Sequence, residues 1–418
     1  MITLQKIVDR AGSEGKTIDA TTAAFVLGSY AARRKSEKEE EKQHDIVVVG
    51  NYGETLDWVD GKGKGIDIVS VSRDGSMKCV SNIGSTKTRN PSYVISDANG
   101  KTIYVCDERY DQDGTIEVFR REGETDFKLV HTTGSGGKGS CHMTLDASES
   151  HLICASYFGD GFSVYQLIKE GCVSEKFTLV KHSNLDKLND LTPVVYPGKN
   201  VERQERCHPH MVTFDPKAWN TNLLRVVDLG MNAVCSYVFQ KGAATLRSTF
   251  VLPPGAGPRH MAFHPRHRYA YIVNELDSTL TSCVVDASSG KMKALCTCST
   301  LPSGFPGAGD DSKSTCAAIR MHPSGRWIYC SNRVVSDQGL LSHFKIDPYN
   351  GMATLKSVTP TCGITPRDFN FAFQGSLILV ANQDSDNIAC FQVDKKTGHL
   401  SYTGSKIRTA TPVSLCVL

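Results

Sequence analysis

The chain has 418 residues and a mass of 45.6 kDa, and 47 Lys and Arg against 44 Asp and Glu leave a net charge of +3. This near balance lacks the basic excess that binding to a phosphate backbone requires, so we expect no nucleic acid among its partners. The sequence contains no run of 18 or more apolar residues, and we therefore expect no membrane-spanning helix and no membrane partner.

The first 44 residues differ in texture from the rest of the chain. Residues 20–27 could begin a short helix, and residues 33–42 form a nearly continuous charge run, which is typical of a solvated or disordered tail. Asp9, Glu14 and Asp19 argue against a secretory or mitochondrial presequence. We expect an accessory tail over residues 1–44 and a cytoplasmic location.

Fifteen cysteines are spread singly along the chain. Their number is odd and they stand inside apolar runs such as 104–106 and 328–330, so we expect reduced, buried thiols. The one close pair, Cys296 and Cys298, lacks the second pair that would complete a zinc site.

From residue 45 onward, short β-branched and aromatic runs such as 46–49, 103–105 and 377–380 alternate with clusters of Gly, Asp, Asn, Ser and Pro. This pattern is typical of an all-β protein. A repeated strand start recurs at six positions, and the steps between them are 49, 69, 49, 58 and 50 residues: Ser92, Cys141, His210, Arg259, Ala317 and Arg367. A unit of about fifty residues is the length of a four-stranded propeller blade.

A second element follows each start, and in five of the six units its offset is 16 residues. A constant offset across divergent residues indicates a shared hairpin register. Residues 45–80 and 411–415 supply two partial units that together make a seventh blade. The sequence therefore predicts an all-β, seven-bladed β-propeller with four-stranded blades over residues 45–418, with its ring closed by the C-terminal strand.

Inner strands begin, and second strands end, on the same face of a propeller, so these positions form two rings around one channel mouth. The first ring contains the six starts and Val413, and the second contains Glu108, Tyr157, Leu229, Glu275, Arg333, Gln383 and, less securely, Asn51. Arg259, Arg333 and Arg367 beside Glu275 and His210 predict a pocket for an anionic substrate with one acid–base partner.

Three alternatives stand beside this interpretation. Arg259 and Glu275 could form a salt bridge that only supports their loops. His208 and His210 alternate in an extended segment, so at most one points into the channel; the register favours His210. A metal could bind among His210, Glu275 and the neighbouring asparagines, but three arginines oppose a divalent cation, so we predict no metal.

The segments 257–265 and 274–278, with 203–205, 331–333, 366–369 and 381–386 in the same order, resemble the seven-bladed propeller lactonases of the cycloisomerase 2 family. That family contains 6-phosphogluconolactonases and 3-carboxy-cis,cis-muconate cyclases. The resemblance covers residues 45–418 and implies a propeller without an obligatory metal or organic cofactor. In the cyclase branch of the family a His, two Arg and a Glu are the proposed active-site set, and the resemblance places them on His210, Arg259, Arg333 and Glu275.

Two reactions fit these residues. Hydrolysis of 6-phosphogluconolactone, in the pentose phosphate pathway, would use Glu275 or His210 to activate water and arginines to hold the phosphate. Lactone formation from a carboxylated muconate would use the same arginines on carboxylates. We favour the first; a non-catalytic propeller that binds a protein is the third hypothesis. Further substrate contacts are expected from Arg367, Glu108, Gln383, His208 and Tyr157, and the oligomeric state stays open.

Overall fold

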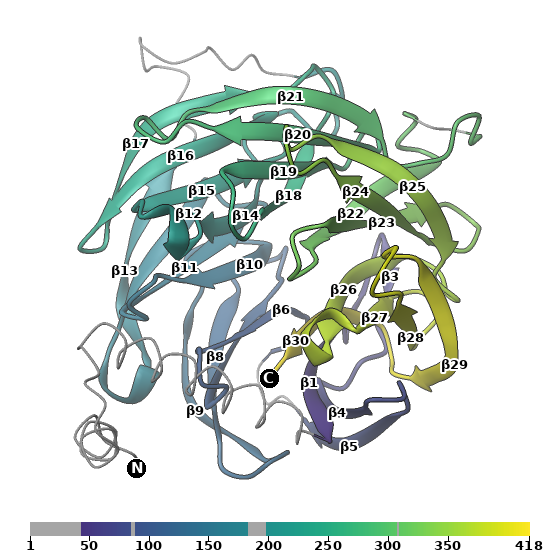
Figure 1. Cartoon of the computed structure of the whole chain (residues 1–418). Helices are drawn as coiled ribbons and strands as arrows, with labels where there is room; N and C mark the ends of the chain where they lie inside the picture. Colours follow the sequence, from purple (N-terminus) through teal and green to yellow (C-terminus); the bar gives the residue numbers. More distant parts are fainter. Residues whose placement is uncertain (1–42, 85–87, 183–197, 307–308) are drawn as a thin grey trace, which may run out of the picture. The chain divides into compact units, whose positions relative to one another are not determined.

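The structure, a computed structural model, describes residues 43–84, 88–182, 198–306 and 309–418. Residues 46–418 form one unit, which contains seven four-stranded antiparallel sheets (Figure 1). This confirms the predicted all-β, seven-bladed propeller. The expected tail over residues 1–44 falls outside the described residues, apart from its last two positions, so its helix and charge run stay predictions.

Each blade begins with an inner strand, and a second strand pairs with it. The inner strands are β30 (Pro412–Val417), β6 (Pro91–Ser96), β10 (Ser140–Leu145), β14 (Pro209–Phe214), β18 (Pro258–Phe263), β22 (Ser314–Met321) and β26 (Pro366–Ala372). The second strands are β1 (His44–Asn51), β7 (Thr102–Asp107), β11 (His151–Ser156), β15 (Leu223–Asp228), β19 (Tyr269–Asn274), β23 (Trp327–Val334) and β27 (Leu377–Asn382).

Two further strands complete each blade. The third strands are β4 (Ile66–Ser72), β8 (Thr115–Arg121), β12 (Gly161–Leu167), β16 (Ala233–Gln240), β20 (Thr279–Val285), β24 (Leu340–Ile346) and β28 (Asn387–Val393). The outer strands are β5 (Met77–Ile83), β9 (Phe127–Gly134), β13 (Val173–Lys181), β17 (Ala243–Val251), β21 (Met292–Ser299), β25 (Ala353–Pro360) and β29 (Leu400–Arg408). Short additions are the hairpin β2 (Thr55–Leu56) and β3 (Val59–Asp60) and the single 3₁₀ turns η1 (Lys169–Gly171), η3 (Lys217–Trp219) and η4 (Phe373–Gly375).

The ring closes between the two ends of the propeller. β30 pairs antiparallel with β1, with Val49 opposite Leu415, and every inner strand contacts the inner strands on both sides of it. The seventh blade is therefore shared by the two ends of the chain, as the partial units predicted. This pairing removes an exposed sheet edge and links the ends of the ring.

Seven apolar clusters hold the blades together, one at each blade-to-blade interface. The inner and second strands supply most of these residues, whereas outer strands such as β13 are largely exposed. All fifteen cysteines lie in the described part of the chain as free thiols, and ten of them are buried. The expectation of small, buried hydrophobic cysteines is confirmed for these ten.

A repeated local geometry places the side chains of both rings. In four of the seven blades, the residue before the inner strand takes a positive φ, as at Gly257 (60°) and Thr365 (54°). Its carbonyl accepts the N–H of the residue that follows the second strand, which is Glu275 or Gln383 in these two blades. Next, the inner strand has a β-bulge at the first-ring position, as at Arg259 between Pro258 and His260. A bulged residue leaves the ladder and is re-aimed, so this backbone motif positions the two rings beside each other.

Candidate functional site

Six of the seven expected first-ring residues line one cavity at the channel. They are Ser92, Cys141, His210, Arg259, Arg367 and Val413, and Glu108 from the second ring joins them. The seventh, Ala317, contributes its carbonyl oxygen, which accepts a hydrogen bond from Arg259 Nη1 at 2.7 Å. The structure thus brings together the seven first-ring residues, one from each blade.

The second ring needs one correction. Asn51 pairs with the inner-strand residue Pro412, and its side chain donates to Asp67 on β4 at 3.0 Å. The residue that follows the strand end, equivalent to Glu275, is Tyr52. The N-terminal part of the seventh blade lacks an inner-strand start, so the offset of 16 residues that fixed the other positions could not be applied there.

Glu275 lies at the centre of three guanidinium groups. Arg203 Nη2 donates to Glu275 Oε1 at 2.7 Å. Arg259 Nε lies 2.9 Å and Arg333 Nη2 3.2 Å from Glu275 Oε2. Glu275 and Arg259 are each only 3% exposed, and Arg203 is 37% exposed at the rim. Arg259 and Glu275 do form the salt bridge that was the alternative to a substrate pocket, but that salt bridge involves only one of the three guanidiniums.

These charges fix the protonation state of the cluster. Burial alone would raise the pKa of Glu275, but the guanidiniums of Arg333, Arg203 and Arg259 outweigh it and hold that pKa far below its ordinary value. Burial lowers the pKa of Arg259 to about 10, so this side chain is still charged at neutral pH. In the described part of the chain these three arginines form ion pairs only with Glu275, which leaves two positive charges in excess.

Glu108 forms a second cluster with different partners. The hydroxyl of Tyr110 donates to Glu108 Oε1 at 2.7 Å, and the hydroxyl of Tyr52 donates to Oε2. Arg367 Nη2 donates to the Tyr52 oxygen at 2.9 Å and lies 3.5 Å from Glu108 Oε2. Its guanidinium also stands over the Trp58 ring at 5.0 Å, a favourable cation–π distance. One carboxylate and one guanidinium balance each other here.

His210 lies in the cavity between these clusters. Its Nδ1 is 4.0 Å from Cys141 Sγ, and its ring packs edge-on against His260 with centroids 5.2 Å apart. Burial, followed by Arg259 and Arg367, lowers the pKa of His210 well below its ordinary value. The imidazole is therefore neutral at neutral pH.

His208, Tyr157 and Gln383 surround the cavity without lining it. His208 contacts the Tyr157 carbonyl at 2.8 Å and Glu205 at 3.0 Å through its two ring nitrogens, and its ring stacks on Tyr157 with centroids 4.4 Å apart. Gln383 donates to Asp384 at 2.8 Å. The structure gives His208 a supporting place behind Tyr157, and the preference for His210 as the channel histidine agrees with this geometry.

Four residues of the two clusters were not among the expected site residues: Arg203, Tyr52, Tyr110 and Trp58. Arg203 also contacts the Tyr157 hydroxyl at 3.1 Å. It belongs to an insertion before β14, so the repeat offset carries no signal for it, although the motif 203–205 belongs to the family resemblance. Tyr110 could have been found because it follows Glu108 by two residues in an otherwise polar turn.

The described residues contain no group of three or more His, Cys, Asp or Glu side chains that could hold a metal ion. The three guanidiniums around Glu275 also oppose a cation at that point. Within the same ranges, no helix is long and apolar enough to cross a membrane.

Comparisons with known proteins identify the family of this chain. The family model described as "Lactonase, 7-bladed beta-propeller" matches residues 46–418. A 6-phosphogluconolactonase from Bacillus subtilis is 28% identical over 84% of this chain and 94% of its own length. A 6-phosphogluconolactonase from Pectobacterium carotovorum is 32% identical over 62% of this chain and 68% of its own length.

A solved structure of a periplasmic gluconolactonase from Pseudomonas aeruginosa has a TM-score of 0.76 and is 24% identical. It covers 90% of this chain and 99% of the solved chain, which supports the propeller fold. The relatives and the matched family confirm the expectation of a lactone-hydrolase family. The chain belongs to the seven-bladed β-propeller lactonase family.

Proposed function

We propose that this chain hydrolyses 6-phosphogluconolactone to 6-phosphogluconate at the channel cavity. The observation that carries the proposal is the excess of positive charge around Glu275, where three guanidiniums meet one carboxylate. A phosphorylated lactone brings a dianionic phosphate and a carbonyl that becomes an oxyanion in the transition state. Guanidinium groups suit both, because their planar donors match oxyanion geometry.

The reaction requires one water molecule and no cofactor. Water adds to the ring carbonyl carbon, the ester C–O bond breaks, and the ring oxygen leaves with a proton as a hydroxyl. The new carboxyl group releases the second proton. The enzyme must therefore stabilise the oxyanion, take a proton from water and deliver one to the leaving oxygen.

Glu275 is a poor base because three guanidiniums occupy its carboxylate oxygens and hold its pKa far below its ordinary value. In this proposal it holds Arg259, which lines the cavity, and Arg333 in place. The two guanidiniums also donate to the carbonyls of Ala317 and Cys316. Neutral His210 is the proton acceptor for the attacking water, since it lies in the cavity beside Arg259. Arg203, at the exposed rim, would hold the phosphate.

Hydrolysis of the freshly generated lactone by the purified chain tests the proposal, with spontaneous ring opening subtracted. Arg259→Ala should lower kcat/KM by about 10²–10³, the usual effect of removing one oxyanion donor. The matched control is Arg247→Ala, because Arg247 on β17 makes a single bond to the Ser289 carbonyl at 2.8 Å, far from the cavity, and should leave activity unchanged.

The same assay separates the alternatives. No turnover of the lactone above background, combined with lactone formation from 3-carboxy-cis,cis-muconate, would replace this function with the cyclase reaction. A wild-type chain inactive on both substrates would favour the protein-binding propeller. Equal loss in Arg259→Ala and Arg247→Ala would show that the effect is not specific to the cavity.

A further inference from the structure

A second pocket lies further along the channel than the candidate site. Its volume is about 280 Å³, and its walls come from five inner strands: β6, β10, β14, β18 and β22, with β26 closing it. Its polar lining residues begin one position beyond the first ring, at Tyr93, His142 and His260, and continue to Arg320 and Asn370. Because a strand advances about 3.3 Å per residue, these side chains lie deeper in the channel than the first ring.

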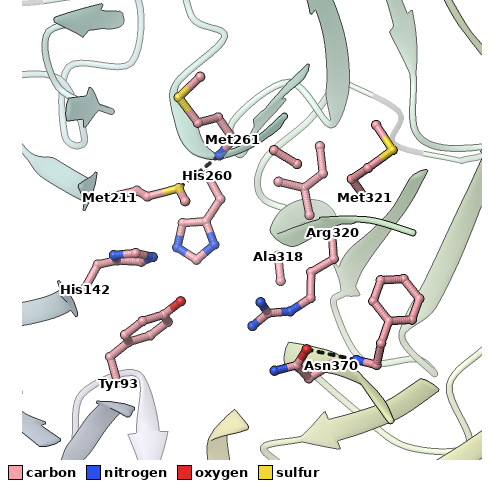
Figure 2. Close-up of a pocket in the computed structure, with 12 residues that line it drawn as sticks. Tyr93, His142, Met211, His260, Met261, Ala318, Arg320, Met321 and Asn370 are labelled. Atoms are coloured by element: carbon pink, nitrogen blue, oxygen red, sulfur yellow. Dashed lines mark hydrogen bonds between the residues drawn. The ribbon is translucent and has the colours of Figure 1, made fainter. Parts of the chain in front are cut away.

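Four polar side chains turn toward this pocket. Figure 2 shows the Tyr93 hydroxyl, the rings of His142 and His260 and the Arg320 guanidinium around one open space. The Tyr93 and His142 rings are stacked with centroids 4.1 Å apart, and the His142 and His260 rings meet edge-on at 5.3 Å. The geometry presents imidazole edges to the pocket.

His142 is the unexplained member of this group. It is 4% exposed, yet among the described residues neither its Nδ1 nor its Nε2 finds a hydrogen-bond partner. Buried polar atoms normally have a partner in the protein or in a bound molecule. A neutral imidazole always carries one N–H, so His142, which lines the pocket, has a donor that no described side chain satisfies.

His260 adds a second donor. Its Nε2 lies 3.4 Å from Arg259 Nη1, and a guanidinium can only donate, so this nitrogen accepts. The neutral ring then carries its proton on Nδ1. Two imidazole N–H groups are therefore available from neighbouring inner strands.

The charge around the pocket selects the kind of ligand. Burial, and then Arg320 and Arg259, lowers the pKa of His142 to about 3, and the same arginines act on His260. Arg320 is neutralised by Asp368 at 2.9 Å, which leaves the partly compensated guanidinium of Arg259 nearby. The positive potential from this guanidinium, together with neutral N–H donors, disfavours a metal cation in the pocket and favours an anion.

We propose that this deeper pocket binds a small oxyanion or carboxylate, with His142 as its principal hydrogen-bond donor and His260 as the second. The ligand class is set by size and charge: a volume of about 280 Å³ admits a small molecule, and the apolar wall of Met211, Ala318 and Phe371 leaves one polar side for it. The pocket shares Tyr93 and His260 with the lining of the candidate cavity, but Arg203 and Arg333 do not line it. Its proposed occupancy does not depend on lactone hydrolysis.

The test uses the full chain labelled with ¹⁵N-histidine, titrated with sodium phosphate in one arm and sodium acetate in the other. Saturable shifts of the His142 ring signals are expected in at least one arm, and the responding arm identifies the anion. The His142 signals are assigned by their loss in His142→Gln and His142→Phe.

Calorimetric titration with the same anion provides the second readout. His142→Phe keeps the stacking on Tyr93 but removes the donor, and it should weaken binding roughly tenfold. His142→Gln keeps an N–H donor and should retain most of the affinity. Arg203→Ala changes the guanidinium cluster around Glu275 and should leave the anion-induced shifts of the His142 signals unchanged. This variant therefore distinguishes anion binding at the candidate site from binding in the deeper pocket.

His343→Phe is the matched control. His343 is also buried, stacks on Tyr329 with centroids 5.2 Å apart, and has an Nε2 without a partner within the described ranges, but it lies on β24, outside the channel pocket. Unchanged His142 signals across both titrations would overturn the proposal. Equal weakening of binding by His343→Phe and His142→Phe would overturn it as well.

Discussion

Glu275 and Glu108 occupy equivalent positions in their blades, each directly after a second strand, but the structure gives them opposite surroundings. Among the residues that the structure describes, Glu275 meets three guanidiniums and no hydroxyl donor. Glu108 meets two tyrosine hydroxyls and one guanidinium, that of Arg367. The same backbone position thus carries a strongly electropositive cluster on one side of the cavity and a neutral, hydroxyl-rich cluster on the other.

The difference teaches what each carboxylate can do. Glu275 is held ionised and has its oxygens occupied, so it organises arginines and leaves a net positive surface for an anionic substrate. Glu108 holds Arg367 through Tyr52, with no excess charge for an anion. Repetition supplies the positions, and the side chains that surround each position determine its chemistry.

The largest effect should follow from removing the charge of Glu275. Glu275→Gln leaves three guanidiniums in repulsion, because an amide cannot balance them, and Arg259 and Arg333 lose their common anchor. We expect lactone kcat/KM to fall by about 10²–10³ and the free energy of unfolding to fall by about 3–5 kcal/mol. Steady-state kinetics and urea denaturation measure both. Glu108→Gln, at the equivalent position, is the comparison; an equal loss there would remove the distinction between the clusters.

The pH dependence of stability should separate the same two variants. The folded-state pKa of Glu275 lies below its ordinary value of 4.5, so its stabilising contribution is fully present above that value and is lost as the pH falls below it. The difference in unfolding free energy between wild type and Glu275→Gln should therefore shrink below about pH 4.5, by at most about 1.4 kcal/mol per pH unit. A difference that stays constant down to about pH 3 would contradict the ionised state.

Arg203 should show the next effect, because it is the most exposed of the three arginines. Arg203→Ala removes a phosphate contact at the rim but leaves Arg259 and Arg333 on Glu275. We expect KM for the phosphorylated lactone to rise about tenfold, the cost of one charged hydrogen bond, with kcat nearly unchanged. The unphosphorylated lactone is the control substrate, and its KM should not move; an equal rise for both would show that Arg203 does not contact phosphate.

The repeat allowed the fold and most of the positively charged cluster to be predicted from the sequence. Arg259, Glu275 and Arg333 occupy ring positions that recur at fixed offsets, because the bulge at the start of the inner strand repeats in each blade. The pairing of β30 with β1 followed from two partial units that needed each other. These features depend on backbone geometry, which a repeat records directly.

Residues outside the repeat could not be placed in the same way. Arg203 comes from an insertion, and it contacts Glu275, which lies 72 residues later in the sequence. The repeat does not predict a contact from an inserted segment. In the seventh blade the prediction fell on Asn51, one position before Tyr52, because this blade takes its inner strand from the other end of the chain. His208 was expected to reach substrate, whereas stacking on Tyr157 and contacts through both ring nitrogens give it a supporting place.

The smallest effect is expected in the Glu108 cluster, from Tyr110→Phe. This change deletes one hydrogen bond of 2.7 Å to Glu108 Oε1, while Tyr52 and Arg367 still hold the other oxygen. The loss of one such bond is about 1 kcal/mol, so kcat/KM should fall only a few-fold. Steady-state kinetics on the phosphorylated lactone measure this decrease in kcat/KM, with Arg247→Ala as the control variant whose activity should not change. A decrease in kcat/KM as large as that of Glu275→Gln would contradict this order of effects. Loss of one hydroxyl can lower kcat/KM that much only if the hydroxyl acts on the reacting atoms, so the Glu108 cluster would then control the chemistry.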